Sequence, residues 1–182
     1  MRAAVLQEIG RPFVLTDVRE PKASAGKAVV KVEACGICHT DMSLMRGLKQ
    51  PPKLPIILGH EIAGQVHATS NESGFAPDDS VVVYINISCG QCGYCRSGAE
   101  NLCEKGSSIY GGFAEFVEVP TKNLLPKPKN VSFEGGAVLA CAGTTVYHAL
   151  RDIARLQIGE KVAIFGAGGL GAFAIQIAKA SG

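Results

Sequence analysis

The chain has 182 residues, of which 47% are apolar and 19% charged, and its net charge is +2. This composition allows a sizeable core, whereas the lack of a basic run or an aromatic ladder argues against nucleic acid as a partner, and no apolar stretch is long enough to span a bilayer. Gln7 and Glu8 directly follow the first apolar residues, so the start does not resemble a signal peptide and a cytoplasmic location is predicted.

Most of the chain before residue 131 predicts a mainly β fold. The 22 glycines and 9 prolines separate short apolar runs, which favours strands and tight turns over a helix bundle. One short helix is predicted over residues 40–46, ended by Gly47. The strand candidates are residues 3–6, 13–18, 27–34, 62–68, 80–84 and 113–119.

Helical spacing begins near Ser132, which is a predicted N-cap for a short helix through Ala137. A longer helix is predicted from about residue 143 to residue 154. Residues 161–165 then form a continuous apolar run, as a buried parallel strand does. A glycine turn follows, and the apolar residues of 170–180 share one face of a predicted helix.

This last β-turn-α unit is incomplete as a fold. One parallel strand with one helix cannot bury both faces of a sheet, so we expect the chain to be truncated relative to the fold that it begins. The expected division is a β-rich domain over residues 1–140 and a connector helix with the start of an α/β domain over residues 141–182. Because the strand 161–165 should have unpaired edges, we also expect a homo-oligomer.

Four of the seven cysteines lie close together in the sequence: Cys89, Cys92, Cys95 and Cys103. In a reducing compartment such a cluster indicates a metal more often than disulfides. Four thiolates complete the tetrahedral shell of zinc and leave no position for a substrate, so a structural zinc site is predicted. An iron–sulfur cluster is the alternative, although the ferredoxin spacing differs after the third cysteine. Four unrelated buried thiols are a third interpretation.

A second group of metal-binding residue types is spread along the chain. Cys38 is followed by Asp41, His60 by Glu61, and Cys141 comes much later. Each is weak evidence alone, because Cys38 also forms a Cys-x-x-Cys pair with Cys35, a single histidine is most often structural, and Cys141 has the size of a core residue. Together they supply soft and borderline ligands of the kind that a catalytic zinc takes in threes.

These motifs occur in the order and spacing of one family. The segments 36–41, 59–61, 112–115, 141–145 and 166–171, with the four-cysteine cluster, resemble the zinc-dependent medium-chain alcohol dehydrogenases over the whole chain. The resemblance implies a GroES-like catalytic β-barrel over residues 1–140, followed by the first β-α unit of a Rossmann coenzyme domain. It also implies zinc at two sites and oxidation of a small-molecule alcohol to an aldehyde or ketone.

The resemblance assigns roles to particular residues. It implies that Cys38, His60 and Cys141 hold the catalytic zinc, while Glu61 lies behind it and enters the coordination sphere when substrate is absent. Asp41 is implied to accept the ring N–H of His60 and fix its tautomer. The hydroxyl that takes the alcohol proton is implied to belong to Thr40. Where many members carry a histidine that relays this proton, the chain has Ser43, which relays through water.

The coenzyme contacts follow from both motif and resemblance. The glycines of a G-x-G-x-x-G fingerprint stand between an apolar run and a predicted helix, the context that dinucleotide binding needs, with pyrophosphate expected at the helix N-terminus. Their positions are Gly166, Gly168, Gly169 and Gly171. The resemblance adds His39 near the pyrophosphate and Thr145 near the nicotinamide. NAD and NADP both remain open, because the acidic residue that would distinguish them falls at or beyond residue 182.

Three hypotheses for function follow. The first is a zinc-dependent alcohol dehydrogenase, of which these 182 residues bind zinc but turn over alcohol little or not at all, because most of the nicotinamide pocket is missing. The second is a short zinc-binding homologue without catalysis that acts as an interaction module. The third is an iron–sulfur or redox protein. Ser43 and a short loop between Cys103 and Gly111 leave the identity of the alcohol open.

Overall fold

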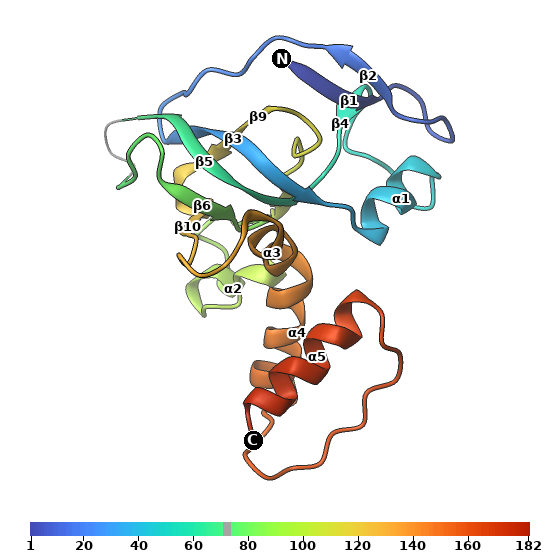
Figure 1. Ribbon diagram of the computed structural model, residues 1–182, viewed down its shortest axis with the longest axis vertical. Helices are drawn as coiled ribbons and strands as arrows, with labels where there is room; N and C mark the ends of the chain where they lie inside the picture. Colours follow the sequence, from blue (N-terminus) through green and yellow to red (C-terminus); the bar gives the residue numbers. More distant parts are fainter. Residues whose placement is uncertain (71–73) are drawn as a thin grey trace.

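The computed structural model describes residues 1–70 and 74–182 (Figure 1). Its largest sheet is five-stranded and antiparallel, with the strand order β10-β6-β5-β3-β9. These five strands are β3 (Lys27–Gly36), β5 (Glu61–Thr69), β6 (Ser80–Val83), β9 (Phe116–Pro120) and β10 (Leu124–Pro126). Two smaller antiparallel sheets comprise β1 (Arg2–Leu6), β2 (Val14–Asp17) and β4 (Ile56–Ile57), and β7 (Asn86–Ile87) with β8 (Ser107–Ser108).

Each of the six predicted strand candidates contains a strand, with β9 beginning at Phe116 rather than at residue 113, whereas the short strands β4, β7, β8 and β10 were not predicted. The main core lies on one face of the large sheet and consists mainly of β-branched side chains, which pack well on a pleated surface. Its fully buried members include Val30, Ile62, Val66, Val81 and Val119. Burial of this face fixes the register, since a slip by one residue would expose the whole set.

A second core holds the helix α1 (His39–Met45), which ends at the Arg46 cap and at Gly47, where φ is +76°. Leu44 of α1 packs against Leu6, Ile56 and Leu58. Because Leu58 directly precedes the Gly59-His60 turn, this cluster links the position of α1 to the start of β5.

One continuous helical run leaves the large sheet. It passes through α3 (Phe133–Val138), a π-helical segment (Leu139–Gly143), α4 (Thr144–His148) and a second π-helical segment (Ala149–Ile153). The predicted cap is confirmed, because the Ser132 hydroxyl accepts a hydrogen bond from the Gly135 N–H at 3.1 Å. The two predicted helices are therefore one, and the expected boundary at residue 140 falls inside it.

This helical run is attached to the sheet by small side chains. Ala137 and Ala140 are buried against Ala63 of β5 and Val82 of β6. Gly136 packs so closely that a Cβ atom there would lie 3.1 Å from a Val82 methyl group. Close packing of the helix on the sheet sets the position of the following residue, Cys141.

The strand predicted over residues 161–165 is wrong. These residues form no strand, Val162 is 41% exposed and Phe165 is 96% exposed. A parallel strand needs a neighbour to receive its N–H groups, and in Figure 1 this segment runs outside the helical arm with no strand beside it among the described residues. The predicted self-association was based on the unpaired edges of this strand. It therefore stays a prediction, and this observation no longer supports it.

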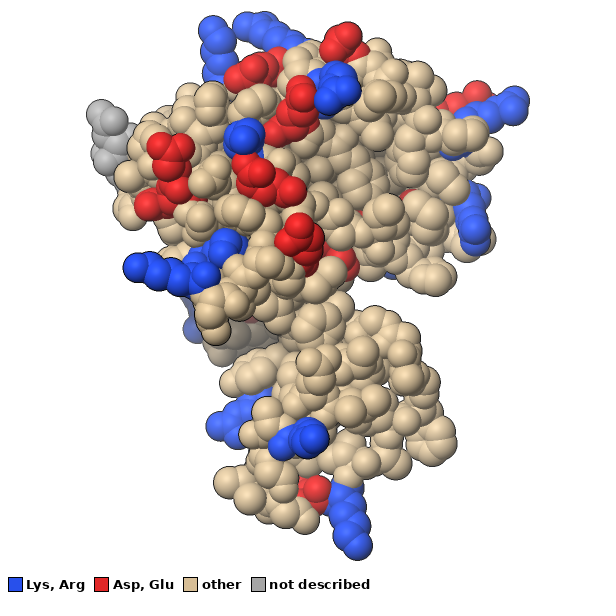
Figure 2. Space-filling view, in the orientation of Figure 1, with Lys and Arg blue, Asp and Glu red and all other residues tan. Residues whose placement is uncertain are grey.

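The final helix, α5 (Gly169–Ala180), follows the predicted glycine turn and packs against α4 and the first π-helical segment. Gly166 has φ +93°, and a Cβ atom at Gly171 would lie 1.9 Å from the Gly166 carbonyl oxygen, so the turn requires both glycines. Within the described residues, none of the helices has the length and apolar character to cross a membrane. Basic and acidic side chains are interspersed on the viewed face of the sheet region (Figure 2).

Burial in the second core predicts which substitutions lower the free energy of unfolding. Leu6 is fully buried in it, so Leu6→Ala should lower the free energy of unfolding by about 2–5 kcal/mol. Leu15 on the adjacent strand β2 is 68% exposed, and Leu15→Ala should change it by less than about 0.5 kcal/mol. Urea unfolding followed by circular dichroism measures both, and equal losses would show that the assignment of the buried face is wrong.

Candidate metal centres

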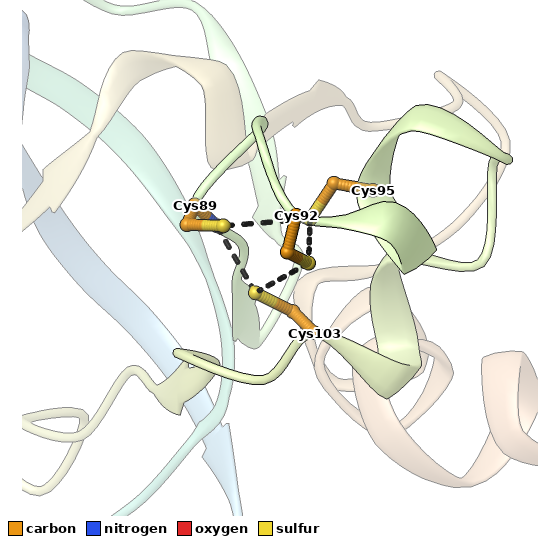
Figure 3. A group of neighbouring side chains, drawn as sticks. All are labelled: Cys89, Cys92, Cys95 and Cys103. Carbon is orange, nitrogen blue, oxygen red and sulfur yellow. Dashed lines mark hydrogen bonds between the residues drawn. The ribbon is translucent and has the colours of Figure 1, made fainter.

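The four clustered cysteines converge on one point from a loop beside the large sheet (Figure 3). Cys89 follows β7, Cys92 caps the short helix α2 (Gly93–Arg96), Cys95 lies within it, and Cys103 caps the 3-10 helix Glu100–Leu102. Gly90, at φ +74°, turns the chain between the first two thiols. The sequence spacing therefore brings all four sulfur atoms within 4.8 Å of one another.

The sulfur separations match the demands of a single tetrahedral ion. The Cys92 and Cys95 sulfurs are 3.4 Å apart, and Cys89–Cys95 and Cys92–Cys103 are each 3.9 Å apart. Thiolates at about 2.3 Å from a tetrahedral zinc ion are separated by about 3.8 Å. All four are free thiols, since a disulfide would need about 2.05 Å. The donor set thus fits one ion.

Backbone dipoles favour the thiolate form in this cluster. The N–H groups of Gln91 and Cys92 are directed at the Cys89 sulfur and lower its pKa to about 6. The pKa of Cys95 is raised to about 12 by burial and by the neighbouring thiols. Four thiolates at these distances repel one another, so full deprotonation needs a cation at the centre.

Two residues that the sequence did not single out attach this loop to the large sheet. Asn123 is 2% exposed and donates to the carbonyl oxygens of Tyr84 and Asn86, both at 2.8 Å. Lys122 donates to the Ser88 carbonyl at 2.7 Å. Both residues contact partners more than thirty positions away in the sequence. No local motif in a single sequence reveals such a contact.

The second group assembles from three separate parts of the chain. Cys38 caps α1, His60 and Glu61 stand where β5 begins, and Cys141 lies in the first π-helical segment. One donor atom from each of these four residues lies within 4.8 Å of the others. The sequence therefore named a set of residues that the fold brings together, although they are up to about a hundred positions apart.

Asp41 joins the elements of this group. Its carboxylate is fully buried and accepts hydrogen bonds from the N–H groups of Cys38 at 3.0 Å and Gly59 at 3.1 Å. It also lies 3.3 Å from Nδ1 of His60. With Nδ1–H directed at Asp41, the lone pair of Nε2 is available to a metal.

The surroundings of His60 favour a positive charge on the Nε2 side of the ring, and a metal ion that binds Nε2 displaces the proton from it. Burial alone would lower the pKa of His60, but hydrogen bonds to Asp41 and to the thiol of Cys141 outweigh burial and raise this pKa to about 10. The Tyr110 ring meets the His60 ring edge to face, with centroids 5.9 Å apart. Sequence reasoning missed Tyr110, because no motif marks it.

The remaining predicted catalytic residues lie on α1 or beside the group. Thr40 is half-buried, and its N–H donates to the Cys38 sulfur at 3.5 Å. Ser43 is half-buried one helical turn further along α1, and no hydrogen bond joins the two hydroxyls in the described part of the chain. Cys35 lies outside both groups and packs in the main core, and burial raises its pKa to about 12.

The predicted coenzyme contacts lie on three separate elements: α1, α4 and the turn before α5. His39 is exposed at the start of α1, and Thr145 is exposed on α4. The glycine turn leads into α5 at the end of that helix opposite the C-terminus, which is the end nearer to the sheet region (Figure 1). Thr145 lines an open cleft between α4 and the cysteine loop, with Tyr84 and Leu102 among its walls. Contact of these residues with a coenzyme stays a prediction.

Comparisons with known proteins agree with this arrangement. The profile of the alcohol dehydrogenase GroES-like domain matches residues 24–129, and the chain belongs to this family. An alcohol dehydrogenase of Geobacillus stearothermophilus is 40% identical over 189 residues, which cover 100% of this chain and 56% of that protein. The crystal structure of an NAD-dependent alcohol dehydrogenase superposes with a TM-score of 0.93 at 34% identity, covering 100% of this chain and 56% of the other.

A further solved structure carries information about metals. A cobalt- and zinc-bound thermostable alcohol dehydrogenase from Pyrobaculum aerophilum superposes with a TM-score of 0.93 at 31% identity, covering 100% of this chain and 57% of the other. The chain thus spans a little more than half the length of the relatives that it matches.

The position of Asp41 predicts a large effect of an isosteric substitution. Asp41→Asn should lower the free energy of unfolding by about 2–4 kcal/mol, because the amide nitrogen would replace one of the two oxygens that accept the N–H groups of Cys38 and Gly59, and the charged acceptor would be lost. Asp17→Asn on the exposed strand β2 is the matched control and should change it by less than about 0.5 kcal/mol. Urea unfolding of the zinc-loaded chain measures both; equal stability of all three proteins would contradict the central role of Asp41.

Proposed function

We propose that the chain holds two zinc ions and that the second one serves alcohol oxidation. The observation that supports this proposal most strongly is the convergence of two separate donor sets, each within 4.8 Å. Cys89, Cys92, Cys95 and Cys103 form a closed set that fills a tetrahedral shell, which is typical of a structural site. The small separation of the sulfur atoms favours one ion over an iron–sulfur cluster, whose inorganic sulfides would hold the cysteines further apart.

The second site is proposed to use Cys38, His60 and Cys141, with Glu61 as an additional ligand when no substrate is bound. Three permanent protein ligands leave a position open, which is typical of a catalytic zinc. A zinc ion held by these residues would supply Lewis-acid chemistry, lowering the pKa of an alcohol hydroxyl. The described relatives, all of them alcohol dehydrogenases, favour this class of reaction over a purely structural role.

The chain's own residues then have distinct tasks. Asp41 holds the His60 ring and its tautomer, so that Nε2 is directed at the metal position. Thr40 is proposed to accept the proton of the alcohol hydroxyl, and Ser43 to pass it toward solvent through water. Removal of that proton would leave an alkoxide, whose oxygen electron pair forms the C=O bond as the carbinol C–H bond breaks and its hydride passes to an oxidised nicotinamide.

The coenzyme is proposed to be NAD or NADP, and the NAD-dependent relative supports NAD. His39, Thr145 and the glycines 166, 168, 169 and 171 are its proposed contacts, with α5 presenting its N-terminal N–H groups to the pyrophosphate. We retain the division into a catalytic domain over residues 1–140 and the start of a Rossmann coenzyme domain over residues 141–182 as part of this proposal.

Counting metal ions tests the two sites independently. The wild-type chain should carry two zinc ions in native mass spectrometry. Cys103→Ser should remove the structural ion, and Cys38→Ser should remove only the second ion. Cys35→Ser is the matched control and should retain both, because Cys35 lies outside the two groups. Iron in place of zinc, or two ions in every variant, would refute the proposed sites.

A turnover assay tests the role of the coenzyme segment. We expect the 182-residue chain to oxidise alcohols slowly or not at all with NAD or NADP. The reason is that the segment before the glycine turn has no sheet beneath it, so the turn is not fixed relative to the second metal site. Rapid alcohol-dependent formation of the reduced coenzyme by the purified chain would contradict this expectation.

A further inference from the structure

Gly36 and Glu61 face each other where two strands meet beside the second metal site. Gly36 ends β3, Glu61 begins β5, and the two are direct partners in the antiparallel pair. Side chains of such partners lie on the same face of a sheet, with Cβ atoms normally about 4.5–5.5 Å apart. Here a Cβ atom added to Gly36 would lie only 3.0 Å from the Cβ of Glu61.

The Glu61 side chain lies directly across the Gly36 backbone. The added Cβ would be 1.9 Å from Oε2 of Glu61 and 3.0 Å from its Cδ. Real Cβ atoms do not approach another heavy atom to 1.9 Å, so a side chain at position 36 and this conformation of Glu61 exclude each other. The carboxylate is also confined, because Glu61 as a whole is only 6% exposed.

Gly64 in the same strand pair shows that this is not a general property of the sheet. A Cβ atom at Gly64 would meet the carbonyl oxygen of Lys31 at 2.0 Å, so that glycine allows two backbones to approach. At Gly36, all three nearest atoms belong to the Glu61 side chain. The space above Gly36 is therefore filled by the Glu61 side chain, which contributes a donor atom to the second group of metal-binding residues.

We propose that Gly36 is a positioning residue whose missing side chain provides the slot through which the Glu61 carboxylate reaches the group of Cys38, His60 and Cys141. This inference rests on the proposed second zinc site. With a methyl group in the slot, Glu61 must take another rotamer and its carboxylate leaves the group. The site then has three protein donors, and Gly36→Ala acts on the metal through Glu61 alone.

A double-mutant cycle between Gly36→Ala and Glu61→Ala tests the proposal. The first readout is the affinity for the second zinc ion, from competition with a chelator and ion counting by native mass spectrometry. Each single variant should bind this ion about tenfold more weakly than wild type, and the double variant no more weakly than Glu61→Ala. The zinc ion of the four-cysteine site should be retained throughout. The proposal would be overturned if the double variant lost affinity by the product of the two single losses. An unchanged affinity in Gly36→Ala would also overturn it.

The second readout is the unfolding midpoint of the metal-free chain, which does not depend on the zinc proposal. Gly36→Ala should lower the midpoint, and Glu61→Ala should restore part of this loss, because it removes the contacts at 1.9 Å and 3.0 Å with the carboxylate but leaves the Cβ of residue 61 at 3.0 Å. Gly64→Ala is the matched control and should also lower the unfolding midpoint. Adding Glu61→Ala to this variant should not restore the midpoint, because the new methyl group clashes with the Lys31 carbonyl oxygen and not with Glu61.

The two readouts separate the possible failures. If Gly36→Ala does not fold, recovery of the fold in the double variant supports the slot, and a double variant that also stays unfolded overturns it. If the wild-type chain holds only the ion of the four-cysteine site, the proposed second metal site fails, while the coupling between positions 36 and 61 in the metal-free chain still decides whether the slot exists.

Discussion

The buried carboxylate of Asp41 is the interaction on which the second metal site depends. It accepts the N–H groups of Cys38 and Gly59 and lies beside Nδ1 of His60. One side chain thereby joins the start of α1 to the turn before β5. A buried charge without partners would be costly, so these three donors stabilise the carboxylate while it fixes the geometry of two proposed ligands.

The two proposed zinc sites differ in how much of the fold each one needs. The four-cysteine site is contained in one loop, and its connection to the sheet depends on Asn123 and Lys122. The second site needs the β3–β5 pair, α1 and the helical run from residue 133 to be in place together. Its third ligand, Cys141, is positioned by packing of Ala137 and Ala140 on the large sheet. The first is therefore expected to tolerate changes elsewhere in the chain better than the second.

The sequence was sufficient for features that depend on local residue patterns. The six predicted strands of the β-rich part, the Ser132 cap, the short helix at residue 40 and the closed cysteine set all follow from spacing and apolar periodicity, and the structure contains them. The short strands β4, β7, β8 and β10 were not predicted, since two or three paired residues give no periodicity to detect. The strand at residues 161–165 failed because an apolar run forms a strand only where a neighbour accepts its hydrogen bonds. Gly36, Tyr110 and Asn123 could not be found from one sequence, since their roles arise from contacts with residues distant in the chain.

The central claim is that two separate donor sets each enclose one zinc ion. Anomalous diffraction at the zinc absorption edge from crystals of the chain tests this claim most directly. The account predicts two peaks, one among the sulfur atoms of Cys89, Cys92, Cys95 and Cys103 and one within bonding distance of Cys38, His60 and Cys141. A single peak in the cysteine loop, with well-ordered but metal-free side chains at the second group in zinc-saturated crystals, would contradict it.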